Sequence, residues 1–206
     1  VSAGQLDRIC ATAWERRQLI DGGPLTRVAP GVYRVRGAPD THQQRLTLGL
    51  LSLGEQSWVS YEAAATLHRL DRSNPVAVEF TVLRGTRQPK LPSRVHTTTR
   101  LPAIDRVSVS DFRTTSATRT IIDLAHARRS PQRIEAAIDS AVRTGLSAPS
   151  VLAHRIETIR GSGRWGCRLI DELVVDSGGH SPLERRFLRI VREAGLPRPK
   201  TQVIHR

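Results

Sequence analysis

The sequence predicts an α+β protein: a winged helix that lacks its first helix, then a mixed domain with a small, mostly antiparallel sheet and a helical C-terminal half. Three observations predict this fold class. A short helix pattern runs directly into a basic hairpin pattern at residues 12–36, apolar residues alternate with period two between 75 and 112, and capped helix patterns dominate from residue 116 onward. The predicted domain boundaries fall after residues 38 and 178.

Four short elements are predicted in the first 38 residues, at Ser2–Cys10, Ala13–Ile20, Leu25–Ala29 and Val32–Arg36. Ser2 and Thr12 precede the two helices as caps. Leu6 and Ile9 are expected to face inward from the first helix. Pro30-Gly31 places a tight turn between the two strands. A helix pair followed at once by a basic hairpin is typical of winged-helix DNA-binding modules, in which the second helix enters the major groove.

Six side chains in this region are candidates for DNA binding: Arg16, Arg17 and Gln18 on the second helix, and Arg27, Arg34 and Arg36 on the hairpin, or wing. The helix would enter the major groove while the wing lies along the DNA backbone. A solvated helix face is the competing interpretation of Arg16 and Arg17. Trp14 is expected to pack against the protein rather than to contact bases.

The middle of the chain combines helix and strand patterns. Helices are predicted at His42–Leu53 and Tyr61–Leu67, and strands at Ser57–Val59, Val76–Leu83, Arg94–Thr98, Arg106–Val109 and around Phe112. Within Val76–Leu83, alternate residues Val76, Val78, Phe80 and Val82 predict one strongly apolar face. This pattern favours a small sheet covered by helices.

The C-terminal half is predicted to be helical. Its expected elements are helices at Ala117–Arg128, Pro131–Thr144, Pro149–Ile159 and Arg164–Asp176, a last helix that opens at Ser181-Pro182 and ends at Gly195, and a last short strand at Thr201–Ile204. The pair Ser130-Pro131 is a strong start signal, because proline is favoured at the first helical position after a cap.

The charge of the chain indicates a polyanionic partner. Its 206 residues include 32 basic and 19 acidic side chains, a net charge of +13, and basic side chains that meet phosphates release counterions. Only Lys90 and Lys200 are lysines, so the other basic residues are arginines. Arginine suits bidentate contacts to phosphate and guanine, although GC-rich codons would produce the same preference for arginine over lysine.

With no signal peptide and no long apolar run, the protein is expected to be cytoplasmic, without membrane partners. Cys10 and Cys167 match no metal spacing, so neither metal nor cofactor is predicted.

Five segments together resemble the AbiEi-type antitoxin and transcriptional-regulator family of bacteria, especially its long actinobacterial branch. They are LTRVAPGVYRVRG (25–37), WVSYEAAATLHRL (58–70), RTTSATRTIIDLA (113–125), AIDSAVRTGL (137–146) and SPLERRFLRIVREAGLPRP (181–199). The resemblance implies a winged helix that binds double-stranded promoter DNA, and an α/β domain at 39–178 that serves repression and neutralisation of a nucleotidyltransferase-like toxin. The protein is expected to act on the operator as a homodimer or in several copies on repeats.

The last of these segments also resembles the opening of a very-short-patch-repair-like endonuclease domain, predicted at 179–206. In the longer relatives the winged helix would begin before Val1 and the endonuclease domain would continue past Arg206. Under this alternative Glu184 would bind Mg²⁺ together with carboxylates from later strands. Ser181 and Glu184 also form a capping-box pattern, which is the favoured interpretation. The chain by itself is therefore not expected to be an enzyme.

Overall fold

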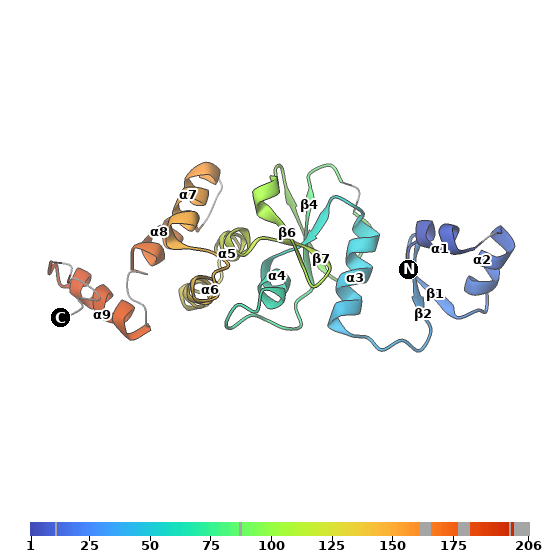
Figure 1. Ribbon diagram of the computed structural model, residues 1–206, viewed down its shortest axis with the longest axis horizontal. Coiled ribbons are helices and arrows are strands. Elements are labelled where there is room, and N and C mark those ends of the chain that lie inside the picture. The colour runs from blue at the N-terminus through green and yellow to red at the C-terminus, as the bar shows by residue number, and fades with distance from the viewer. Residues whose placement is uncertain (11, 87, 161–165, 177–181, 198, 200–206) are drawn as a thin grey trace. The chain divides into compact units, whose positions relative to one another are not determined.

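The computed structural model describes the chain except for residues 11, 87, 161–165, 177–181, 198 and 200–206. The described residues form nine α-helices, a two-stranded hairpin and a five-stranded mixed sheet, so the α+β class is confirmed (Figure 1). The chain divides into two compact units, one of residues 1–68 with 73–116 and one of residues 69–72 with 117–206. The predicted boundaries after residues 38 and 178 do not coincide with this division and stay predictions.

The first elements are α1 (Ala3–Ile9), α2 (Ala13–Ile20), β1 (Leu25–Ala29) and β2 (Val32–Val35). The predicted caps are confirmed: Ser2 and Thr12 each form a reciprocal capping box with the third helical residue. Gly31, with a φ of +69°, takes the left-handed position of the turn between β1 and β2. Leu6 is buried as expected, but Ile9 is 72% exposed and its predicted inward orientation is wrong.

The larger sheet has the strand order β5-β4-β3-β7-β6. Its strands are β3 (Ser57–Val59), β4 (Glu79–Leu83), β5 (Arg94–Thr98), β6 (Arg106–Val109) and β7 (Phe112–Thr115). Two neighbouring pairs, β4–β5 and β3–β7, are parallel, and two, β3–β4 and β6–β7, are antiparallel. The predicted mostly antiparallel sheet is therefore corrected to a mixed one. Period-two alternation appears in strands of either direction, so it could not distinguish the two arrangements.

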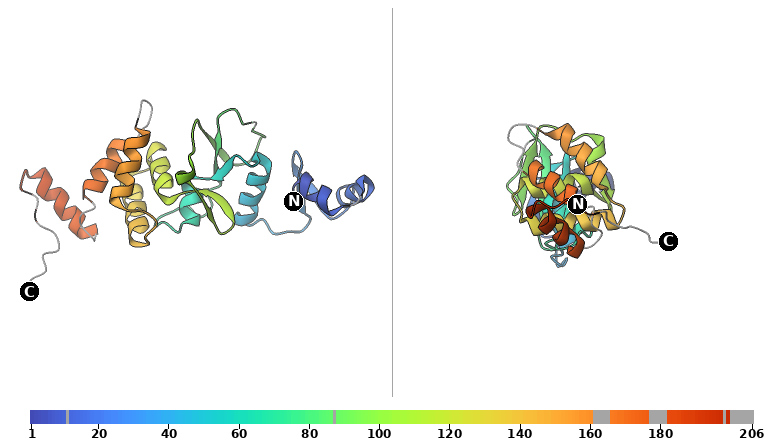
Figure 2. Two further views of the ribbon diagram at one scale, coloured as in Figure 1. Left: turned by 45° about the horizontal axis from the view of Figure 1, so that its top comes forward. Right: turned by 90° about the vertical axis from the view of Figure 1, so that its left-hand side faces the viewer.

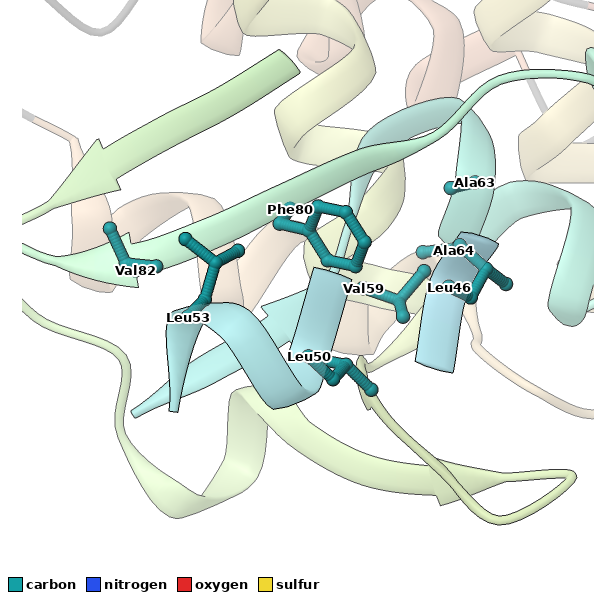
Figure 3. Packing of buried hydrophobic residues seen from close by; sticks show 8 residues of the cluster. All are labelled: Leu46, Leu50, Leu53, Val59, Ala63, Ala64, Phe80 and Val82. Atoms are coloured by element: carbon teal, nitrogen blue, oxygen red, sulfur yellow. The ribbon is translucent and has the colours of Figure 1, made fainter. Parts of the chain in front are cut away.

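Two helices of the same unit, α3 (His42–Leu53) and α4 (Tyr61–Leu67), contribute to the core around β3 and β4. The core residues are Leu46, Leu50, Leu53, Val59, Ala63, Ala64, Phe80 and Val82 (Figure 3). Gly49 of α3 allows the close approach of Phe80, because a Cβ atom there would lie 2.1 Å from the ring. The predicted apolar face of β4 is thus confirmed at Phe80 and Val82, whereas Val76 precedes the strand and is 68% exposed.

The opposite face of β4 is also covered, which the alternation did not predict. Glu79 and Thr81 are buried there. The Glu79 carboxylate accepts a hydrogen bond from the backbone N–H of Glu62 at 3.1 Å, and the Thr81 hydroxyl donates to Ser60 at 2.8 Å. Glu79 thereby satisfies a backbone donor in the first turn of α4, a role usually filled by the helix's own cap.

The second unit consists of α5 (Ala117–His126), α6 (Pro131–Arg143), α7 (Pro149–Ile159), α8 (Cys167–Asp176) and α9 (Pro182–Glu193). Helix α5 packs against α6, α7 and α8 (Figure 2). It holds a buried ion pair between Arg119 and Asp123, joined at 2.8 Å. The predicted strand at 201–204 lies outside the described residues. Among the helices that the structure describes, none is long and apolar enough to span a bilayer.

Candidate nucleic-acid interface

Helix α2 is fixed at both of its ends by local contacts. At its start, the Thr12 hydroxyl accepts from the backbone N–H of Glu15 at 3.2 Å, and the Glu15 carboxylate accepts from the backbone N–H of Thr12 at 3.0 Å. Past its end, Gly23 passes so close to the helix that a Cβ atom there would lie 2.1 Å from the carbonyl oxygen of Gln18. The chain then enters β1, which packs against α2. The sequence therefore positions α2 through a reciprocal cap at its start and a glycine-containing segment after its end.

The side chains of α2 divide into an inner and an outer face. Arg16, Leu19 and Ile20 are partly buried, and their spacing of three and four residues places them on one side of the helix. Trp14, Arg17 and Gln18 have the same spacing on the other side and are exposed. No residue of α2 is buried. This outer face presents one aromatic, one cationic and one amide side chain to solvent, and Ala13 and Glu15 of the helix are exposed as well.

Trp14 lies on this outer face, contrary to its predicted packing against the protein. Its expected packing inside the protein is wrong, because the side chain is 68% exposed. The signal that identifies its true position is spacing: Trp14 precedes Arg17 by three residues and Gln18 by four. Trp14 therefore lies on the same exposed face of α2 as Arg17 and Gln18, and it joins them as a candidate binding residue.

Arg16 lies apart from the other two candidates on the helix. Its guanidinium forms an ion pair with Asp7 of α1. The pair joins α1 to α2. Arg16 is therefore held beside a carboxylate, whereas Arg17 and Gln18 are exposed on the outer face of the helix.

The three wing arginines are also divided. Arg27 pairs with Tyr33 across the hairpin, and cross-strand partners share a face. Arg34 follows Tyr33 directly, so it lies on the opposite face from Arg27. Arg27 and Arg36 are exposed, and Arg34 is partly buried. Arg27 and Arg36 are thus accessible to a ligand, whereas Arg34 lies on the opposite face of the hairpin from Arg27 and is less accessible.

Arg34 lies near Asp40, in the segment that joins the hairpin to α3. Arg45 donates two hydrogen bonds to the Asp40 carboxylate, both at 3.0 Å. These bonds lower the pKa of Asp40 below its ordinary value, and the positive charge of Arg34 lowers it further. Arg34 therefore contributes its charge to a local cluster of charged residues.

The residue predicted for the endonuclease alternative falls in α9. The Glu184 side chain and its predicted capping partner Ser181 both lie outside what the structure describes. In the described ranges, no three His, Cys, Asp or Glu side chains gather as metal ligands would. The candidate residues whose side chains the structure describes lie on α2, on the β1–β2 hairpin and directly after β2.

Comparison with known proteins gives a likeness of fold. No protein-family profile matches the sequence, and no curated protein matches it at a significant level. The structure is similar to the crystal structure of RV2827C protein from Mycobacterium tuberculosis, with a TM-score of 0.56 and 16% sequence identity. The superposition covers 99% of this chain and 78% of the mycobacterial one. At this identity the likeness shows a shared fold.

Proposed function

We propose that this protein binds double-stranded DNA in a sequence-specific way and acts as an antitoxin-type transcriptional repressor. The observation that carries the proposal is the outer face of α2. Trp14, Arg17 and Gln18 are exposed there, on the second of two helices that are three residues apart in the sequence. In helix-turn-helix proteins the second helix enters the major groove and its side chains contact base edges. A helix that buries none of its residues is free to enter a groove.

The backbone pairing ahead of α1 supports a winged-helix arrangement for this region. Ser2 forms an antiparallel bridge with Val32, and the N–H of Tyr33 donates to the carbonyl oxygen of Val1 at 2.8 Å. The segment before the helix pair therefore lies beside β2 and extends the β1–β2 hairpin on that side. This pairing joins β2 of the wing to the residues directly before α1, so that the helix pair and the wing form one small module.

The charge of the module agrees with a phosphate-rich partner. Residues 1–38 contain six arginines, at positions 8, 16, 17, 27, 34 and 36, and three acidic residues, at positions 7, 15 and 21. The exposed Arg27 and Arg36 of the wing are available for the DNA backbone. Contacts of this kind supply affinity without sequence information, while side chains in the groove supply specificity. In this proposal the side chains of α2 supply the specificity for a DNA sequence, and the wing arginines supply affinity for the DNA backbone.

The regulatory part of the proposal rests on the resemblance to AbiEi-type antitoxins. It extends the function to repression at a promoter by a homodimer, and to neutralisation of a nucleotidyltransferase-like toxin. The alternative is a Mg²⁺-dependent endonuclease activity, and it rests on Glu184. Nicking of plasmid DNA that needs Mg²⁺ and disappears in Glu184→Ala would establish the alternative. Equal, background nicking by both proteins would remove it.

The proposal is tested by selection from a library of random DNA duplexes with the full chain. We expect the retained duplexes to share a short consensus, and Arg17→Ala/Gln18→Ala to abolish its enrichment. The matched control is Arg168→Ala/Gln56→Ala, which removes the same two side-chain types from α8 and from the loop before β3. The control should recover the wild-type consensus. Retention of no duplexes by the wild-type chain would overturn the proposal.

A further inference from the structure

Two of the exposed side chains on α2 have chemistry suited to reading bases. Arg17 and Gln18 are both exposed, and neither side chain hydrogen bonds to another residue in the described part of the chain. Their donors and acceptors are therefore available to a ligand. Arginine matches the two major-groove acceptors of guanine, O6 and N7. Glutamine matches adenine, because its amide donates to N7 and accepts from the N6 amino group.

The neighbouring polar side chains of α2 are already engaged. Glu15 caps the helix with its carboxylate, and Arg16 is paired with Asp7. Trp14 is exposed on the same face but has only one donor, its indole N–H, and no acceptor. This leaves Arg17 and Gln18 as the pair on the helix that can each form a bidentate contact with a base.

Their positions on the helix limit which bases they can reach together. Arg17 and Gln18 are consecutive, so their Cα atoms differ by about 1.5 Å in rise along the helix. Neighbouring bases along one strand are about 3.4 Å apart. Two long side chains that start this close together can reach adjacent base pairs.

We infer that Arg17 and Gln18 are specificity-determining residues that read a guanine and an adenine in adjacent base pairs of the major groove. This inference rests on the proposed function, since it names the bases that the same helix recognises. Arg27 and Arg36 on the wing contribute to affinity for every sequence alike.

The test compares the consensus selected by the wild-type chain with those selected by Arg17→Ala and by Gln18→Ala. We expect the wild-type consensus to contain a guanine next to an adenine. Arg17→Ala should lose the preference at the guanine alone, and Gln18→Ala at the adenine alone. Arg36→Ala is the matched control, because it removes an exposed arginine from the wing and should weaken binding without changing the consensus.

A single-atom change in the DNA identifies the contact itself. Replacing the guanine by 7-deazaguanine removes its N7 acceptor and should weaken wild-type binding about tenfold or more. The same replacement should leave the affinity of Arg17→Ala unchanged. For Gln18, 7-deazaadenine at the adjacent position provides the corresponding pair of measurements.

The outcomes separate this inference from the function on which it rests. A consensus without the guanine–adenine step, or one that both variants retain at lower affinity, would overturn the inference and leave DNA binding standing. Failure of the wild-type chain to select any duplex would overturn both. Position-specific loss in each variant, together with the matching response to 7-deaza bases, supports both.

Discussion

Asp7 of α1 and Arg16 of α2 form an ion pair that joins the two helices, with 54% of the Asp7 side chain and 39% of the Arg16 side chain exposed. An exposed pair of this kind contributes about 0–1 kcal/mol to stability. Its larger consequence is electrostatic. Asp7 neutralises the one arginine of α2 that lies on the inner face, so Arg17 remains as the helix's unpaired cation among the described residues.

Replacing Asp7 by Asn should raise affinity for duplex DNA. The change removes a negative charge beside the proposed interface and releases Arg16 for a phosphate contact. We expect the slope of log K against log[salt] to steepen by about one, because one further counterion is released. The free energy of unfolding should fall by about 1 kcal/mol or less. Fluorescence anisotropy across a salt series measures the first effect and urea denaturation the second.

Glu172→Gln is the charge-matched control for this experiment. It breaks an exposed pair with Arg168 inside α8 and changes the net charge by the same amount. Its salt slope should equal that of the wild type. An equal rise in affinity for both variants would mean that Asp7 acts only through the total charge of the chain.

Gly23, which follows α2, and Gly4 of α1 should respond in opposite ways to alanine. Gly23→Ala brings a Cβ atom to 2.1 Å from a backbone carbonyl oxygen of the helix, which cannot move aside cheaply. We expect a loss of about 1–3 kcal/mol and faster hydrogen exchange of the α2 amides. Gly4→Ala in α1 meets no atom within 4 Å and should stabilise the helix by up to about 1 kcal/mol. Similar exchange rates in the two variants would contradict the role given to Gly23.

Local signals predicted most of the elements, because caps, prolines and apolar spacing act within a few residues. Ser130-Pro131 and Thr41 mark helix starts where the structure has them. The direction of strand pairing was not predictable in this way. Whether β5 runs parallel to β4 depends on the path of residues 84–93, which contain no periodic signal. The polar contacts that bury Glu79 are likewise set by α4, a neighbour distant in sequence.

The sequence predicted which residues and elements form the candidate site better than it predicted their contacts and the faces on which they lie. The sequence predicted six polar side chains on a helix and a hairpin; the structure places five of them on α2, β1 and β2, and Arg36 directly after the end of β2. It could not show that Asp7 engages Arg16, because that contact depends on the angle between two helices. Nor could it separate Arg34 from Arg27, since the face of each residue depends on the hairpin register.

The close packing of Gly49 against Phe80 predicts a compensating pair of substitutions. Gly49→Ala places a methyl group against the Phe80 ring and should cost about 1–3 kcal/mol of unfolding free energy. Phe80→Leu should also destabilise, by opening a cavity. In the double variant the smaller leucine makes room for the methyl group, so the loss should be smaller than the sum of the two. Additive losses in urea denaturation would show that the two residues are not coupled.

His68 should make stability depend on pH. Its ring hydrogen bonds to the carbonyl oxygen of Thr115 at 2.7 Å, and burial lowers its pKa below the ordinary value of 6.5. As the pH falls below about 6.5, the unfolded chain binds a proton that folded His68 does not, so the free energy of unfolding decreases. This contribution is fully present above that pH and is lost as the pH falls toward the folded pKa.

His68→Gln checks this prediction, because glutamine keeps an N–H donor for Thr115 but does not titrate. Urea denaturation between pH 7.5 and about 5 should show a steeper decline for the wild type than for the variant. Parallel curves would assign the pH dependence to other groups.

The most direct test of DNA binding by helix and wing is the salt dependence of affinity for the selected duplex. The wild-type chain should give a linear decrease of log K with log[salt]. Arg27→Ala/Arg36→Ala should reduce its slope by about two, at roughly 0.9 for each phosphate that an arginine no longer neutralises. The control Arg160→Ala/Arg168→Ala removes two exposed arginines from the second unit and should keep the wild-type slope. A slope that is the same in all three proteins would contradict the placement of the wing on DNA.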